Sequence, residues 1–172
     1  FLVGDLKSYE RVGHFRYQSM PGGDLATKEP WRMALSYLLS TYGEIPEGVK
    51  AFDCIAEYEL QLVTQATMKG INAPLTSSCG RLFDAVAALL GLRQKVSFEG
   101  QAAMQLEMLA DPAQSQPYPY LLSDDADQII FDPSQLIDAI IKDHSARLPK
   151  AQIAGRFHLS LARMITEVCI QI

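Results

Sequence analysis

Apolar side chains recur along this chain three to four residues apart, the spacing of an α-helix, in six segments. Trp31, Leu35 and Leu38 are an example, because positions i, i+4 and i+7 share one helix face. The helices that this spacing predicts cover residues 29–42, 56–69, 78–90, 100–110, 134–145 and 150–172. The pattern therefore favours a fold in which helix dominates.

Short apolar or alternating runs predict four strands around these helices. They cover residues 1–6, 12–20, 118–122 and 128–131. Lys7-Ser8 is the expected turn after the first strand, and the acidic run 124–127 is expected as a solvated turn between the last two. The expected fold class is thus α/β, an α-rich chain with a few short strands.

The helix expected over residues 78–90 has the clearest boundaries. Thr76-Ser77-Ser78 supplies favoured N-cap side chains before it, and Gly91 is the residue type most favoured directly after a helix. The helix is mainly apolar and carries two charged residues, Arg81 and Asp84. These two residues are the first candidates for chemistry.

Asp84 has two interpretations. Ala87 and Ala88 follow it at i+3 and i+4, so a sugar could approach this face and donate hydrogen bonds to the carboxylate. Alternatively, Asp84 pairs with Arg81 on the helix surface, which would contribute only a few tenths of a kcal/mol. The local sequence leaves both open.

The start of the same helix is a candidate anion site. A helix N-terminus exposes unpaired N–H groups and the positive end of the helix dipole. Ser77, Ser78 and Arg81 would add hydroxyls and a positive charge to a bound phosphate. The alternative is that one serine merely caps the helix. A thiol at Cys79 would have its pKa lowered in such a position, or it is simply buried and inert.

Two further glycine-containing segments are candidates for contact with a ligand. Glu99-Gly100 opens the next helix, where a glycine permits either close backbone approach to a ligand or tight helix packing. Gly22, Gly23 and Asp24 form either an active-site loop or an ordinary turn from strand to helix. No catalytic residue is singled out.

Composition narrows the class of protein. The 172 residues suit one domain, with the Pro- and Gln-rich connector 111–119 as a candidate subdivision. The net charge of −5 and the lack of a basic stripe argue against nucleic-acid binding. No apolar run reaches the length of a membrane span, so no membrane association is expected. Three widely spaced cysteines and no His-x₃-His pair predict no disulfide framework, no metal site and a cytoplasmic location.

Both ends of the chain suggest a piece of a longer protein. Phe1-Leu2-Val3 reads as the middle of a strand, and Ile170-Gln171-Ile172 ends a helix without a stop signal. We therefore expect truncation at both ends.

Four segments resemble, in order, motifs of the HypF carbamoyltransferases, which mature the cyanide ligands of nickel–iron hydrogenase. They begin with Pro-Gly-Gly-Asp, Asn-Ala-Pro-Leu-Thr-Ser-Ser-Cys-Gly-Arg-Leu-Phe-Asp, Phe-Glu-Gly-Gln and Gly-Arg-Phe-His, at residues 21, 72, 98 and 155. The resembled region is the Kae1-like domain, part of an ATPase fold of the actin/Hsp70 (ASKHA) type. The whole chain, residues 1–172, would be a partial Kae1-like domain.

The resemblance implies a carbamoyltransferase activity in the full-length protein. A carbamoyl-adenylate, made from carbamoyl phosphate and ATP, would deliver its carbamoyl group to the C-terminal cysteine of a partner, HypE. ATP and a divalent metal are the implied cofactors, with the metal ligands outside this chain. The chain alone is expected to be inactive.

By the same resemblance, Phe83-Asp84 supplies a ribose-binding carboxylate, and Glu99-Gly100 approaches the nucleoside. Ala85 replaces the lysine of the related threonylcarbamoyl-transfer proteins, which favours the HypF branch. Two alternatives remain: such a tRNA-modifying protein, and a non-catalytic helical interaction module. The module predicts Asp84 paired to Arg81 or exposed, whereas the nucleotide site predicts Asp84 beside a cleft shared with Gly100.

Overall fold

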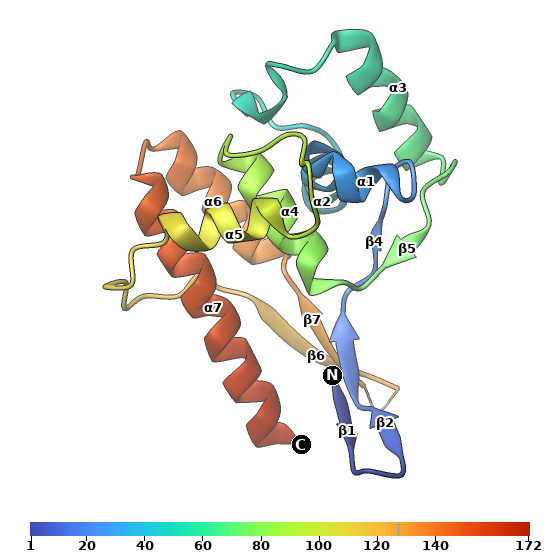
Figure 1. Ribbon diagram of the computed structural model, residues 1–172, viewed down its shortest axis with the longest axis vertical. Coiled ribbons are helices and arrows are strands. Elements are labelled where there is room, and N and C mark those ends of the chain that lie inside the picture. The colour runs from blue at the N-terminus through green and yellow to red at the C-terminus, as the bar shows by residue number, and fades with distance from the viewer. Residues whose placement is uncertain (127) are drawn as a thin grey trace.

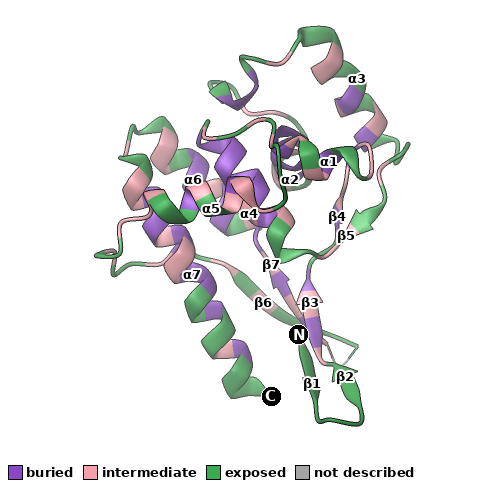
Figure 2. Cartoon of the chain, in the orientation of Figure 1, coloured by how far each residue is buried: buried purple, intermediate pink, exposed green. Residues whose placement is uncertain are grey.

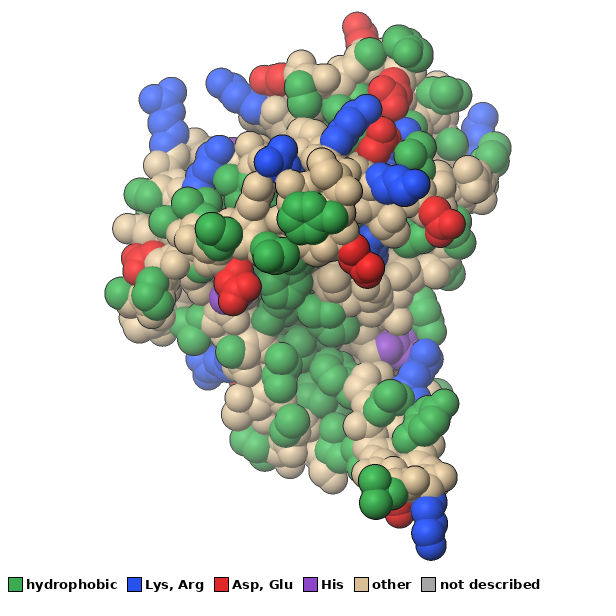
Figure 3. Space-filling view, viewed as in Figure 1, with side chains coloured by type: hydrophobic (Ala, Val, Ile, Leu, Met, Phe, Trp, Pro, Cys, Tyr) green, Lys and Arg blue, Asp and Glu red, His purple; other side chains and the backbone are tan. Residues whose placement is uncertain are grey.

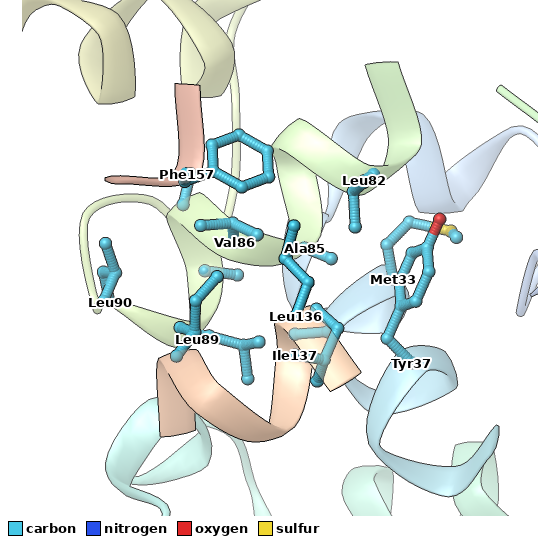
Figure 4. Close-up of a cluster of buried hydrophobic side chains, with 14 of the residues drawn as sticks. Met33, Tyr37, Leu82, Ala85, Val86, Leu89, Leu90, Leu136, Ile137 and Phe157 are labelled. Atoms are coloured by element: carbon cyan, nitrogen blue, oxygen red, sulfur yellow. The ribbon is translucent and has the colours of Figure 1, made fainter. Parts of the chain in front are cut away.

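The computed structural model describes residues 1–126 and 128–172. Its centre consists of apolar faces from four helices, which converge in one buried cluster (Figure 4). The four helices are α2 (Pro30–Tyr42), α4 (Cys79–Leu89), α6 (Ser134–Ser145) and α7 (Lys150–Gln171). α4 is buried along most of its length, which explains its nearly continuous apolar sequence.

The ends of α2 and α4 follow from local sequence. Pro30 occupies the first turn of α2, where its missing N–H costs nothing. Gly91 has a φ of 67° after α4. Its N–H donates to Ala88 O, and the N–H of Leu92 donates to Ala87 O. These two bonds form a Schellman motif, which stops α4 where the sequence predicted.

A three-stranded sheet lies beside the helices in the order β3-β7-β6. β3 (Gly13–Phe15) runs parallel to β7 (Gln128–Asp132), and β7 runs antiparallel to β6 (Leu121–Asp125). Phe15 is opposite Phe131, with ring centroids 4.7 Å apart. This aromatic pair joins the sheet to the helical core.

Two further antiparallel pairs flank the sheet. β1 (Leu2–Gly4) and β2 (Tyr9–Arg11) form an exposed hairpin around the predicted Lys7-Ser8 turn. This hairpin projects at the same end of the molecule as the free end of α7 (Figures 1, 2 and 3). β4 (Gln18–Ser19) pairs with β5 (Leu75–Thr76), so the segment before α4 is fixed against the segment before α2.

Three short or peripheral helices complete the fold. They are α1 (Leu25–Lys28), α3 (Glu57–Met68) and α5 (Gln101–Leu109), together with a 3₁₀ turn at Lys50–Phe52. In Figure 1, α1 lies in front of α2, and the segment from α4 to α5 passes beside it. This arrangement brings four separate parts of the chain to one face: α1, β5, the start of α4 and the α4–α5 segment.

Several expectations from the sequence need correction. The strand expected over 12–20 is divided into β3 and β4, because the chain leaves one sheet and pairs with β5. The strand expected over 118–122 begins only at Leu121 and includes Asp124 and Asp125, which were expected in a turn. The end of that acidic run, Asp127, lies outside the described residues. α1, β2 and β5 were not predicted, since elements of four, three and two residues are too short to show a periodicity.

The connector 111–119 is held against α6 and α7. The Tyr118 hydroxyl donates to Asp143 Oδ2 at 2.7 Å, and Ser160 Oγ accepts from the Tyr118 N–H at the same distance. Arg156 stacks over the Tyr118 ring, 4.1 Å from its centroid. The proposed subdivision at this connector stays a prediction. No helix in the described parts of the chain has the length and hydropathy to cross a membrane.

Candidate functional site

A cleft of about 530 Å³ opens where α1, β5, the start of α4 and the α4–α5 segment meet. Its lining residues come from all of these elements: Met20, Thr27, Lys28, Thr76, Ser78, Arg81, Val96, Ser97, Phe98 and Glu99. Four of them carry hydroxyls, two carry a positive charge and one, Glu99, carries a negative charge, so the lining has a net positive charge. The cleft is therefore suited to a polar, negatively charged ligand.

The N-terminus of α4 contributes to this cleft. Ser78 is the N-cap residue, with an extended backbone, and it lines the cleft together with Arg81. The first N–H groups of α4, those of Cys79 and Gly80, precede any possible helical acceptor. Ser78 makes no side-chain cap to its own helix. Helix dipole, free N–H groups and the Arg81 guanidinium therefore concentrate positive potential at one end of the cleft.

Arg81 and Asp84 form an ion pair behind the cleft wall. Arg81 Nη2 lies 2.9 Å from Asp84 Oδ2, and the Asp84 side chain is only 5% exposed. Burial raises the pKa of Asp84 to about 6, although the Arg81 charge acts to lower it. Across the described residues, Asp84 Oδ2 and Arg81 Nη1 are buried without a hydrogen-bond partner. The two side chains are thus close, but part of their hydrogen-bonding capacity is unused.

This geometry agrees with each of the two interpretations of Asp84 only in part. The expected pairing with Arg81 is present, but its placement on the helix surface was wrong, because the Asp84 side chain is buried and that of Arg81 is only 13% exposed. The cleft wall is formed by Arg81 and Glu99 rather than by Asp84 and Gly100 themselves. Asp84 therefore lies one helical turn behind the residue that faces the ligand space.

The opposite wall of the cleft is the α4–α5 segment, which is fastened to α1 and α2. Lys95 Nζ lies 3.0 Å from Glu29 Oε1, and the N–H of Val96 donates to Lys28 O at 2.9 Å. Glu29 also receives a 2.6 Å hydrogen bond from the buried Arg32. Although burial acts to raise the pKa of Glu29, its bonds to Arg32 and Lys95 keep that pKa low. The cleft is thus bounded by a group of ionised side chains, in which Glu29 pairs with both Arg32 and Lys95.

Glu99 and Gly100 lie at the start of α5. Glu99 lines the cleft, and Gly100 is the N-cap residue of α5 with a φ of 77°. A Cβ built on Gly100 would meet no atom within 4 Å. Its glycine is explained by the left-handed backbone, and the space beside it is open rather than filled by a packed helix.

The Gly22-Gly23-Asp24 turn leads into α1 at the edge of the cleft. Both glycines have positive φ, 85° and 57°, and the N–H of Gly22 donates to Asn72 O. None of the three residues is part of the cleft lining, whereas Met20 and Thr27 on either side of them are. The turn therefore positions cleft residues.

Cys79 and Ser77 lie at the start of α4, and neither lines the cleft. Desolvation of the sulfur raises the pKa of the Cys79 thiol, the opposite direction from the lowering considered for a helix N-terminus. The Cys79 residue is exposed, so the buried alternative was wrong. Within residues 1–126 and 128–172, no group of His, Cys, Asp and Glu side chains could hold a metal ion.

Sequence reasoning missed several residues of the cleft. Thr27 and Lys28 reach it only because the unpredicted α1 brings them there. Thr76 was among the hydroxyl residues expected at this helix start, and the unpredicted β4–β5 pair holds it at the cleft. Phe98 lies in the family motif Phe-Glu-Gly-Gln but was given no role. Its signal was a large aromatic residue directly before a glycine-containing helix start.

These features define an α/β subdomain with a basic, hydroxyl-lined cleft at a helix N-terminus. The chain belongs to the family described as "Carbamoyltransferase, Kae1-like Domain, second subdomain", whose model matches residues 1–172. It is 46% identical over 121 residues to the carbamoyltransferase HypF of Rhodobacter capsulatus, covering 70% of this chain and 16% of that protein. Against the HypF of Synechocystis it is 32% identical over 187 residues, covering 99% of this chain and 24% of the relative.

Solved structures agree with this assignment. A crystal structure of full-length HypF in the phosphate- and nucleotide-bound form superposes with a TM-score of 0.86 at 35% identity, over 99% of this chain and 22% of that chain. The HypF of T. kodakarensis gives a TM-score of 0.72 at 30% identity, over 90% and 21%. The expected Kae1-like α/β fold is confirmed. The chain spans less than a quarter of the length of these relatives.

Proposed function

We propose that this chain is the nucleotide-binding part of a HypF-type carbamoyltransferase. In the full-length protein, the carbamoyl group of a carbamoyl-adenylate would pass to the C-terminal cysteine thiol of a HypE-type acceptor, for synthesis of the hydrogenase cyanide ligands. The observation that carries the proposal is the incompletely bonded Arg81–Asp84 pair, which adjoins a basic cleft at the N-terminus of α4.

The phosphate of the adenylate is proposed to lie at the α4 end of the cleft. The unpaired Arg81 Nη1, the first N–H groups of α4 and Lys28 are donors suited to it. The hydroxyls of Thr76 and Ser78 would complete the phosphate contacts. Such contacts fix the leaving group and orient the carbamoyl carbon for attack by a thiolate.

The ribose is proposed to interact with Asp84. Its Oδ2 has no hydrogen-bond partner in the described chain and is held only by the charge of Arg81. When a phosphate attracts the Arg81 guanidinium, Asp84 would lose part of its pairing and would accept hydrogen bonds from ribose hydroxyls. Glu99 and the open backbone at Gly100 would border the same sugar.

A divalent metal and carbamoyl phosphate remain part of the proposal for the full-length protein. The described residues form no metal cluster, so no step of transfer is assigned to a metal here. This chain would bind and orient the adenylate, and we expect no turnover from it alone.

The test uses full-length protein that carries Asp84→Ala, with Asp53→Ala as the control for loss of an exposed carboxylate outside the cleft. Adenylate affinity and carbamoyl transfer to the acceptor cysteine are measured for both. Asp84→Ala should weaken both quantities, and Asp53→Ala should change neither. Transfer and affinity that are unchanged in Asp84→Ala would overturn the assignment of Asp84.

A further inference from the structure

Phe98 is a large aromatic side chain that lines the cleft without belonging to the core. Its residue is 54% exposed, whereas its cleft neighbours Met20 and Val96 are partly buried against the hydrophobic core. Among the described residues, its ring is in none of the aromatic pairs of the molecule. Packing within this chain therefore does not explain its position.

The backbone on both sides of Phe98 is fixed. Before it, Lys95 pairs with Glu29 and the N–H of Val96 donates to Lys28 O. After it, Gln101 Oε1 accepts a 2.8 Å hydrogen bond from the N–H of Ser97, which closes the turn at the start of α5. The ring is thus presented at the cleft by a constrained turn. In this position it would contribute binding area at little cost in conformational entropy.

The chemistry of the cleft changes from one wall to the other. Arg81, Ser78 and Thr76 gather at the α4 end, and this end suits phosphate. Phe98 and Val96 form an apolar stretch on the α4–α5 segment. A ligand with an anionic end and a flat apolar end matches both walls, and a nucleotide has these two ends.

We propose that the Phe98 ring stacks on the nucleobase of the nucleotide bound in this cleft. This inference rests on the proposed function, because it adds a contact for the base to the phosphate and ribose contacts given above. Stacking of a base on an aromatic ring depends on a π face, which phenylalanine and tyrosine share and aliphatic side chains lack. Phe98 is therefore a binding residue for the base and takes no part in the transfer chemistry.

The experiment measures ligand affinity at this cleft alone, in the full-length protein. Hydrogen exchange of the segment 76–82, at the phosphate end, is followed by mass spectrometry while AMP is titrated. Tripolyphosphate serves as a probe that lacks a base. The variants are Phe98→Ala, Phe98→Leu and Phe98→Tyr, and Tyr58→Ala is the control for loss of an exposed aromatic residue, since Tyr58 on α3 is 75% exposed.

Loss of one stacked base corresponds to about 1–3 kcal/mol, which is roughly a 5- to 150-fold loss of affinity. We expect Phe98→Ala and Phe98→Leu to weaken AMP binding by this factor. Phe98→Tyr and Tyr58→Ala should keep the original affinity, and tripolyphosphate should bind all variants equally.

Two results would overturn the stacking proposal. One is AMP affinity that is unchanged in Phe98→Ala. The other is tripolyphosphate affinity that falls in parallel with AMP affinity, because a general loss of the turn would then be the cause. If AMP gives the segment 76–82 no protection even in the unaltered protein, the proposed nucleotide site itself fails, which is a distinguishable outcome.

Discussion

Arg81 Nη2 and Asp84 Oδ2 lie 2.9 Å apart in a largely buried ion pair that lacks hydrogen-bond geometry. Within the described chain, neither Asp84 Oδ2 nor Arg81 Nη1 has a hydrogen-bond partner. Buried polar atoms are nearly always bonded, so each exception needs a reason. The adjacent basic cleft provides one, since a bound nucleotide would supply partners for both atoms. The pair is therefore interpreted as part of a binding site rather than as a stabilising contact.

The first prediction concerns the titration of Asp84. Its carboxyl ¹³C signal should titrate with a midpoint near pH 6, because burial raises its pKa to about 6. The Arg81 charge opposes this shift, so Arg81→Ala should raise the midpoint further. Asp138 is the internal control, because its bonds to Lys142 and Tyr42 outweigh its burial and lower its pKa.

The same shift has a consequence for stability. The unfolded carboxyl titrates near pH 3.9, so between that value and about pH 6 the folded chain binds more protons than the unfolded chain. Stability from this group should then fall as the pH rises through that window. A midpoint at or below pH 4 would contradict the buried position of Asp84.

The second prediction compares two residues that fasten the cleft wall. Lys95 is 67% exposed, and Lys95→Met should lower the free energy of unfolding by less than about 1 kcal/mol. Glu29→Gln should lower it by about 3 kcal/mol, because Arg32 would be left buried with only Glu59 as a partner, at 3.2 Å. Urea unfolding of both variants measures the difference. Equal effects would show that Arg32 does not depend on Glu29.

The third prediction concerns Gly155 on α7. A Cβ at this position would overlap the carbonyl oxygen of Asp111 and the side chain of Gln114. Gly155→Ala should therefore destabilise the chain by about 1–3 kcal/mol. Gly80→Ala is the matched control in α4, where the nearest atom is Ser78 Oγ at 3.5 Å. It should be neutral or stabilising by up to about 1 kcal/mol. A thermally unchanged Gly155→Ala variant would argue against close packing of α7 on the connector.

The extent of sequence prediction differs between the helices and the cleft. α2, α4, α6 and α7 lie within a residue or two of the predicted ranges, because their apolar periodicity and their capping residues act locally. The β4–β5 pair joins residues that are far apart in the chain. Each of these strands has only two residues, which is too short for an alternation of apolar and polar side chains to be detected. Local sequence therefore predicted the helices but not the long-range contacts between the segments that join them.

The candidate site shows the same limit. Ser78, Arg81 and Glu99 were identified from helix starts and from the family motifs, and they do line one cleft. Lys28 had no such signal, and Phe98 lay within a family motif without an assigned role, because the roles of both depend on α1 and the α4–α5 segment meeting in space. The burial of Asp84 could not be predicted from its own helix, because it depends on the packing of α4 against other helices such as α2 and α5.

A nucleotide phosphate is proposed to bind at the start of α4, against Arg81. Hydrogen exchange of full-length protein with and without AMP tests it directly, using Arg81→Ala and, as a control, Arg93→Ala at an exposed position outside the cleft. We predict that AMP protects residues 76–82 and 95–101, that Arg93→Ala preserves this protection, and that Arg81→Ala weakens AMP binding about 10- to 150-fold. Exchange in these two segments that does not respond to AMP, or a response that is the same in Arg81→Ala, would contradict the account.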